Sequence, residues 1–268
     1  MKLYLISLSA LAFLLLAGAV LTFSGSRKNS AQASSSSAPV IVELFTSEGC
    51  SSCPPADALL LKLDKQGTVG GVPIIVLEEH VDYWDHQGWK DPFSSAQWTS
   101  RQADYASLLR RDSVYTPQMI VDGWDEFVGS REEQARAAIV DASRKPKATV
   151  DLQTHDESPS RIGVTIVVHA VPPALQSEKA DVWLAVTERG LHINVLRGEN
   201  AGEDLYHSDV LRILRRVGAS HGNKEPSFSG EEKVDLGPEW KRENLRFVAF
   251  VQDPKTMHIL GAAAMGTP

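Results

Sequence analysis

PVIVELFTSEGCSSC, residues 39–53, is the stretch that decides the fold. Residues 39–45 are apolar and rich in β-branched side chains, apart from one glutamate, which is typical of a buried strand. A polar loop follows, and the stretch ends with the only two cysteines of the chain, Cys50 and Cys53. Residues 54–65 then predict a helix with an apolar inner face. The cysteine pair is therefore expected at the junction between a strand and a helix.

The segments up to residue 146 continue this alternation of strands and helices. The pattern predicts a strand at 73–77, a helix that begins at Asp91-Pro92, strands at 119–121 and 126–128 joined by a turn at Asp122-Gly123, and a helix at 132–143 capped by Ser130. The order is strand, helix, strand, helix, strand, strand, helix, with the cysteines directly after the first strand. That is the order of thioredoxins, so residues 39–146 predict an α/β thioredoxin-like domain.

The sequence pattern of the second half of the chain is typical of a β protein. After a linker at Lys145-Pro146-Lys147, short apolar segments alternate with turn residues. We expect strands at 149–152, 162–168, 182–187, 205–217, 233–236, 245–252 and 257–262. Residues 148–268 therefore predict a mainly-β, sandwich-like C-terminal domain.

The N-terminus carries an export signal. Lys2 gives a short positive start, and an apolar run follows to Phe23. Residues 1–25 predict either a signal peptide that is removed or an N-terminal membrane anchor that is retained, because the run is nearly long enough to span a bilayer. Residues 26–38 form a Ser-rich spacer. We expect a periplasmic or secreted protein, tethered to the membrane if the segment is retained.

The charge balance argues against some partners. The chain has 27 basic and 34 acidic residues and a net charge of −7, and no cluster of Lys or Arg stands out. Nucleic acid is therefore not an expected partner. The sequence contains no phosphate-binding glycine loop, no spacing of four zinc ligands and no serine-hydrolase motif, so we expect no cofactor.

The cysteine pair carries the expected chemistry. In an oxidising compartment Cys50 and Cys53 pair with each other, but a loop this short adds only about 2 kcal/mol of stability. The free N–H groups at a helix start stabilise a thiolate, which makes Cys50 the expected nucleophile and Cys53 the resolving thiol. Two alternatives stay open. The cysteines and His80 are the candidate ligands of a copper or zinc ion, or the disulfide stays closed in a non-enzymatic binding module.

Three more residues are candidates for the catalytic site. Thr116-Pro117 directly precedes a predicted strand, where thioredoxins carry a cis-proline beside the disulfide, so we expect a cis peptide bond here. Glu43 lies inside the first strand, where a buried carboxyl with a raised pKa acts as a general base for the resolving cysteine. A solvated glutamate at this position is the alternative. The many polar residues of 196–212 are interpreted as a solvated loop.

Several long motifs of this chain resemble one family. They are VELFTSEGCSSCPPADALL (42–60), HVDYWDHQGWKDPF (80–93), RQADY (101–105), YTPQMIVDG (115–123) and LRGENAGEDLYHSDVLR (196–212). They resemble a bacterial secreted family, related to thioredoxins, that is catalogued as domain of unknown function 1223. The resemblance implies a thioredoxin-like fold and export, and it supplies no substrate. We therefore expect an exported thiol–disulfide oxidoreductase whose partners are protein thiols and disulfides.

Overall fold

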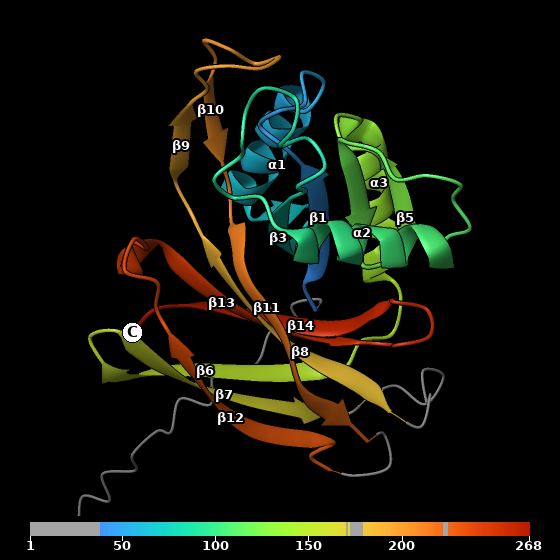
Figure 1. Ribbon diagram of the computed structural model, residues 1–268. Coiled ribbons are helices and arrows are strands. Elements are labelled where there is room, and N and C mark those ends of the chain that lie inside the picture. The colour runs from blue at the N-terminus through green and yellow to red at the C-terminus, as the bar shows by residue number, and fades with distance from the viewer. Residues whose placement is uncertain (1–37, 170, 172–178, 222–224) are drawn as a thin grey trace, which may run out of the picture. The chain divides into compact units, whose positions relative to one another are not determined.

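The computed structural model describes residues 38–169, 171, 179–221 and 225–268 (Figure 1). The predicted signal or anchor at 1–25 and nearly all of the Ser-rich spacer lie outside the described residues. Among the described residues, no helix is both long and apolar enough to cross a membrane.

The first half of the chain forms the elements that the sequence predicts, with shifted bounds, and adds the short strand β2. They are β1 (Val40–Thr46), α1 (Pro54–Gln66), β2 (Thr68–Val69), β3 (Val72–His80), α2 (Ala96–Leu108), β4 (Gln118–Val121), β5 (Asp125–Val128) and α3 (Glu132–Ser143). The predicted helix start at Asp91-Pro92 is wrong, because α2 begins after Ser95, whose hydroxyl accepts from the Gln97 N–H at 3.1 Å. The Asp91 carboxylate is used elsewhere, as described below. Ser130 is likewise not the cap of α3, which begins after Arg131.

The second half is built of strands. They are β6 (Thr149–Ser158), β7 (Arg161–His169), β8 (Ala180–Glu188), β9 (Leu191–Asn194), β10 (Asp204–His207), β11 (Val210–Ser220), β12 (Phe228–Asp235), β13 (Leu245–Gln252) and β14 (Ile259–Gly266), with a short 3-10 turn at Arg242–Asn244. The single strand expected at 205–217 is two strands, because the backbone turns at Asp209, where φ is +50°. β9 and β10 pair as a separate hairpin.

The strands of both halves share one mixed sheet of nine strands. Its order is β14-β13-β8-β11-β3-β1-β4-β5, and β2 pairs with β3. The two halves join where β11 runs parallel to β3, with Val210 opposite Glu78, and the Glu78 N–H donates to the Asp209 carbonyl at 3.1 Å. The prediction of an α/β thioredoxin-like domain followed by a separate sandwich-like domain is therefore wrong. The edge of β3 that β1 leaves free is covered by β11, and this long-range pairing leaves no periodic signal in the sequence.

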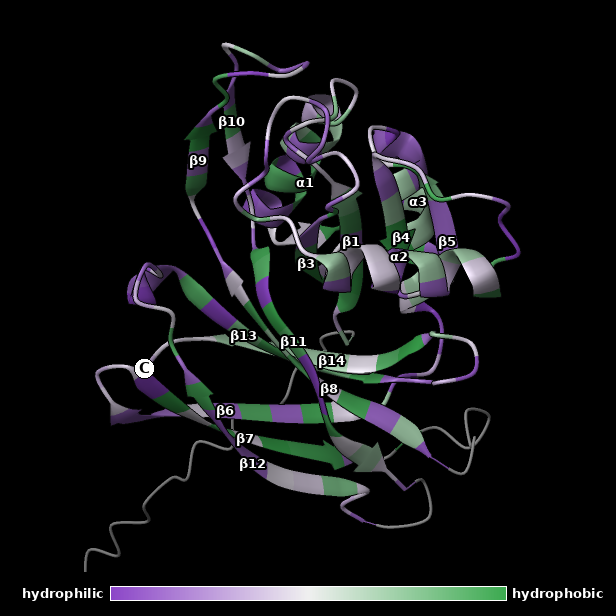
Figure 2. Cartoon of the chain, in the orientation of Figure 1, coloured by the Kyte–Doolittle hydropathy of each residue, from purple (hydrophilic) through white to green (hydrophobic). Residues whose placement is uncertain are grey.

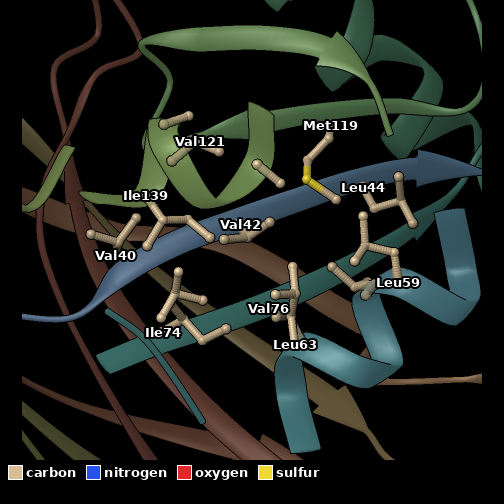
Figure 3. Close-up of a cluster of buried hydrophobic side chains, with 14 of the residues drawn as sticks. Val40, Val42, Leu44, Leu59, Leu63, Ile74, Val76, Met119, Val121 and Ile139 are labelled. Atoms are coloured by element: carbon tan, nitrogen blue, oxygen red, sulfur yellow. The ribbon is translucent and has the colours of Figure 1, made fainter. Parts of the chain in front are cut away.

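Different elements pack against the two faces of this sheet. On one face, alternate residues of β1 pack with α1 and α3, and Figure 3 shows Val42 and Leu44 turned toward Leu59 and Leu63. On the other face, Ile41 and Leu77 pack with Trp98 of α2 and with residues of β8, β11, β13 and β14. The three-stranded sheet β12-β7-β6 packs its apolar residues against β8 and β13. The alternation of polar and apolar residues that this one-sided burial requires is visible along β6 in Figure 2.

Candidate functional site

The two cysteines form the expected disulfide at the start of α1. Cys50 and Cys53 are bonded, with their Cα atoms 5.4 Å apart, and Cys53 is the residue that precedes the first turn of the helix. The Cys53 carbonyl accepts from the Ala56 and Asp57 N–H groups at 2.8 and 3.1 Å. The Ser52 hydroxyl lies 3.3 Å from the Cys50 sulfur. Both cysteines are fully buried. A partner can therefore reach the sulfurs only if the residues around them move.

The loop between β9 and β10, residues 195–203, is hydrogen-bonded to the segment that carries the cysteines. The Asn200 side-chain amide donates to the backbone carbonyls of Glu48 and Cys50, at 2.8 and 3.0 Å. The Glu199 carboxylate accepts from the Ser51 N–H and hydroxyl, at 3.2 and 2.7 Å. The interpretation of 196–212 as a solvated loop is wrong for the buried Asn200, His207 and Asp209, whereas Glu199, Glu203 and Asp204 are exposed. We call residues 195–203 the covering loop.

The predicted proline lies near the cysteine loop. The Thr116–Pro117 peptide bond is cis, as expected. The indole N–H of Trp84 donates to the Thr116 hydroxyl at 2.8 Å. Trp84 also packs on the cysteine loop, since a Cβ at Gly49 would lie 3.1 Å from the Trp84 Cβ. Trp84 thus connects Thr116 with the loop that leads into Cys50.

The structure places Glu43 on the other side of the sheet. Its neighbours in β1, Val42 and Leu44, pack with α1, so the Glu43 side chain faces α2. There it accepts from Arg101 Nε at 2.7 Å and from the Tyr105 hydroxyl at 2.5 Å. The sheet separates Glu43 from the face that carries the disulfide. We therefore leave Glu43 out of the proposed catalytic site.

A group of buried polar residues lies instead at the end of β3, on the face that carries α1. Glu78, His80 and His207 each offer a ligand atom, and these atoms all lie within 4.8 Å of one another. Glu78 Oε1 is 2.7 Å from His207 Nδ1 and 3.5 Å from His80 Nε2. We call these three residues the Glu78–His80–His207 cluster. Strand alternation brings Glu78 and His80 to one face of β3, and β10 supplies His207.

Other carboxylates surround the cluster. Asp91 accepts from His80 Nδ1 at 2.7 Å and from the Glu48 N–H at 2.9 Å, which explains why it does not cap a helix. Glu48 Oε1 lies 3.5 Å from His207 Nε2, and Asp57 accepts from the Thr46 hydroxyl at 2.6 Å. Four of the buried side-chain atoms here have no hydrogen-bond partner in the described structure. They are Glu48 Oε1, Asp57 Oδ2, His80 Nε2 and His207 Nε2.

The charges of the cluster shift the pKa values of its members. Burial alone would lower the pKa of His207, but the Glu78 carboxylate and Glu48 raise it to about 9. Burial would also lower the pKa of His80, and Asp91 raises it well above its ordinary value. Burial alone would raise the pKa of Glu78, but His207 and His80 lower it to about 2. Burial, together with the charge of Glu78, raises the pKa of Asp57 to about 7. The cluster is a strongly coupled set of charges.

Sequence reasoning identified only His80 among the residues of the cluster. Glu78-Glu79-His80 at the end of an apolar strand is a polar run that signals a site. His207 lies 129 residues beyond Glu78, and Asn200 lies 150 residues beyond Cys50. These separations depend on how β9, β10 and β11 are laid against β3, which no local pattern predicts.

Comparisons with known proteins agree with the motifs. The family model described as "Protein of unknown function (DUF1223)" matches residues 41–252. The crystal structure of protein AGR_C_4864 from Agrobacterium tumefaciens is 28% identical, with a TM-score of 0.65 over 85% of this chain and 94% of that chain. HBP35 of Porphyromonas gingivalis shares the fold, with 14% identity and a TM-score of 0.60 over 86% of this chain and 76% of that chain. No curated protein matches the sequence.

Proposed function

This chain belongs to the DUF1223 family of proteins of unknown function, and we propose that it is a thiol–disulfide oxidoreductase that acts on protein substrates. One observation carries the proposal, namely the disulfide between two cysteines three residues apart at the start of α1. The positive end of the helix dipole favours a thiolate on Cys50, the first cysteine of the pair. A cross-link over so short a loop adds little stability, which favours a chemical role over a structural one.

The reaction transfers two electrons from the cysteine pair to a partner. In the reduced protein, the Cys50 thiolate attacks one sulfur of a partner disulfide, forms a mixed disulfide and releases the first partner thiolate. The Cys53 thiolate then attacks the Cys50 sulfur, which restores the Cys50–Cys53 disulfide and releases the second partner thiolate. An external dithiol reduces the pair again. The Ser52 hydroxyl, 3.3 Å from the Cys50 sulfur, is placed to donate a hydrogen bond to the Cys50 thiolate, which supports Cys50 as the nucleophile.

The covering loop controls access in this proposal. Because both sulfurs are buried, exchange with a protein requires the contacts of Glu199 and Asn200 to open. The covering loop also exposes Leu196, whose relative accessibility is 70%. In this proposal Leu196 is one contact point for a partner protein. Partner binding would thus displace the loop and uncover Cys50.

The proposed compartment is outside the cytoplasm. A disulfide that is stable in the resting protein fits an oxidising environment, and the apolar N-terminal segment fits export to the periplasm or beyond. Removal or retention of residues 1–25 decides whether the protein is soluble there or tethered to the membrane.

Trapping of the mixed disulfide tests the function. Cys53→Ala removes the resolving thiol, so covalent adducts of Cys50 with partner proteins should accumulate in the exported fraction of cells. They should be visible on non-reducing gels and vanish on reduction. The double variant Cys50→Ala/Cys53→Ala is the matched control. If the two variants give the same bands, the exchange reaction is absent, and the disulfide is a closed bond in a binding module, a role that the burial of both sulfurs would favour.

A further inference from the structure

We propose that Glu78, His80 and His207 bind one divalent transition-metal ion of the zinc type, in a site distinct from the cysteine pair. The inference goes beyond the proposed redox function. It rests on the placement of two imidazoles and a carboxylate around one point inside the protein, where all three side chains are fully buried. Imidazole nitrogen and carboxylate oxygen are ordinary ligands of zinc.

The distances suit a shared ion. Glu78 Oε1 lies 2.7 Å from His207 Nδ1 and 3.5 Å from His80 Nε2. Ligand atoms at about 2.1 Å from one zinc ion are at most about 4.2 Å apart, and the three ligand atoms here lie within 4.8 Å of one another. At a tetrahedral zinc such atoms are about 3.4 Å apart, so Glu78 and His207 would separate by about 0.7 Å, and the more distant atoms of the cluster would move inward.

The other ring nitrogen of each histidine faces a carboxylate. His80 Nδ1 contacts Asp91 Oδ2 at 2.7 Å, which leaves His80 Nε2 free to face the cluster, where it has no hydrogen-bond partner. His207 Nε2, on the far side of its ring, lies 3.5 Å from Glu48 Oε1. Carboxylates that hold the second nitrogen of a metal-binding histidine fix its orientation and raise its basicity. His80 has this arrangement, whereas His207 Nε2 only faces Glu48 Oε1 without a hydrogen bond.

Buried carboxylates surround the two histidines of the cluster. Glu48, Asp57, Glu78 and Asp91 are all buried, and the charges of Glu78, His207 and His80 all act on Asp57. Buried carboxylates are costly unless a cation or a proton compensates them. Asp57 Oδ2 also has no hydrogen-bond partner. A divalent ion in the cluster would satisfy the unpartnered His80 Nε2.

The position of the site implies a structural role for the ion. Glu78 and His80 end β3, whereas His207 ends β10, the second strand of the β9–β10 hairpin. A bound ion would tie this hairpin to the central sheet. The site would therefore fix the open end of the hairpin that carries the covering loop, without touching the sulfurs.

Metal binding to the purified full chain tests the proposal. The protein is produced without a histidine tag, stripped with a chelator and titrated with Zn²⁺ by calorimetry, and bound zinc is counted by mass spectrometry. We expect one ion per chain, with binding weakened about 100-fold or more in His207→Ala and in the near-isosteric Glu78→Gln. The control is His192→Ala, which removes an exposed histidine of the same hairpin and should bind as the wild type does. Circular dichroism shows which variants are folded.

X-ray absorption identifies the ligands even if a variant fails to fold. The wild-type zinc complex should show nitrogen and oxygen scatterers at about 2.0–2.2 Å and no sulfur at about 2.3 Å. Cys50→Ser/Cys53→Ser should retain its ion. A sulfur shell, or loss of zinc from this cysteine variant, would move the ion to the cysteines and overturn the proposal. Wild-type protein that takes up no stoichiometric ion would also overturn it and leave the cluster as a network of ion pairs.

Discussion

The side-chain amide of Asn200 donates to the backbone carbonyl of Cys50 at 3.0 Å, although the two residues are 150 positions apart in the sequence. The same amide reaches the Glu48 carbonyl at 2.8 Å. One buried side chain thus holds the covering loop to both sides of Gly49. The reactivity of the disulfide should depend on this residue as much as on the cysteines themselves.

Asn200→Ala should make the disulfide react faster. The substitution removes two buried hydrogen bonds to backbone carbonyls and so favours the open loop by about 1–3 kcal/mol. We expect about tenfold faster reduction of the disulfide by dithiothreitol, followed by thiol labelling and mass spectrometry. Asn194→Ala removes an exposed amide of the same hairpin that contacts only Asp204, and it should react at the wild-type rate. Equal rates in all three proteins would show that the covering loop does not limit access.

Ser52→Ala should raise the pKa of the Cys50 thiol in the reduced protein. The Ser52 hydroxyl lies 3.3 Å from the Cys50 sulfur, and a hydrogen bond stabilises the thiolate form. The loss of one such bond at this exposed hydroxyl costs roughly 1 kcal/mol, which is somewhat less than one pKa unit. Thiolate absorbance at 240 nm against pH measures the shift, with Cys53→Ala as background so that only Cys50 titrates. An unchanged titration curve would remove Ser52 from the mechanism.

Glu79→Gln should stabilise the protein at alkaline pH. Both carboxylate oxygens of Glu79 are buried without hydrogen-bond partners, and burial together with the nearby Glu43 raises its pKa well above 4.5. The folded state therefore binds a proton that the unfolded state loses near pH 4.5, so wild-type stability falls as the pH rises above that value. Glutamine has no such proton to lose. Relative to the wild type, the free energy of unfolding of Glu79→Gln should be higher by about 1–3 kcal/mol at pH 8, and this difference should shrink toward pH 5.

Urea unfolding at the two pH values measures this difference. Glu231→Gln, which alters an exposed glutamate of β12, is the control and should track the wild type at both. A gain of equal size at pH 5 and pH 8 would mean that the titration of Glu79 does not cause it.

The sequence predicts local structure well here and long-range arrangement poorly. β1, α1 and the disulfide follow from apolar runs and cysteine spacing, which act over a few residues. The shared sheet does not, because the edge of β3 is covered by β11, more than a hundred positions later. Glu43 shows the same limit within one strand. The sequence leaves open whether it is buried or solvated, and only the packing of α1 and α2 decides which face it takes.

The segment predicted as a linker gives the last test, because the structure ties it into the sheet. Lys147 Nζ forms an ion pair with the Asp122 carboxylate. It also donates a hydrogen bond to the Ile259 carbonyl at 3.1 Å. Asp122 also accepts from the Ile41 N–H at 2.9 Å. This one lysine thus joins β1, the turn after β4 and β14, which belong to the two halves of the chain.

Lys147→Met should lower the free energy of unfolding by about 3 kcal/mol, since it leaves the buried Asp122 carboxylate without its cation. Lys65→Met, at an exposed position near the end of α1, should change it little. Both variants should unfold in one transition by calorimetry, because the halves share a sheet and cannot melt separately without exposing the edges of β3 and β11. Two separate transitions in the wild type, with Lys147→Met affecting only one of them, would instead mean that β11 contributes little to holding the halves together.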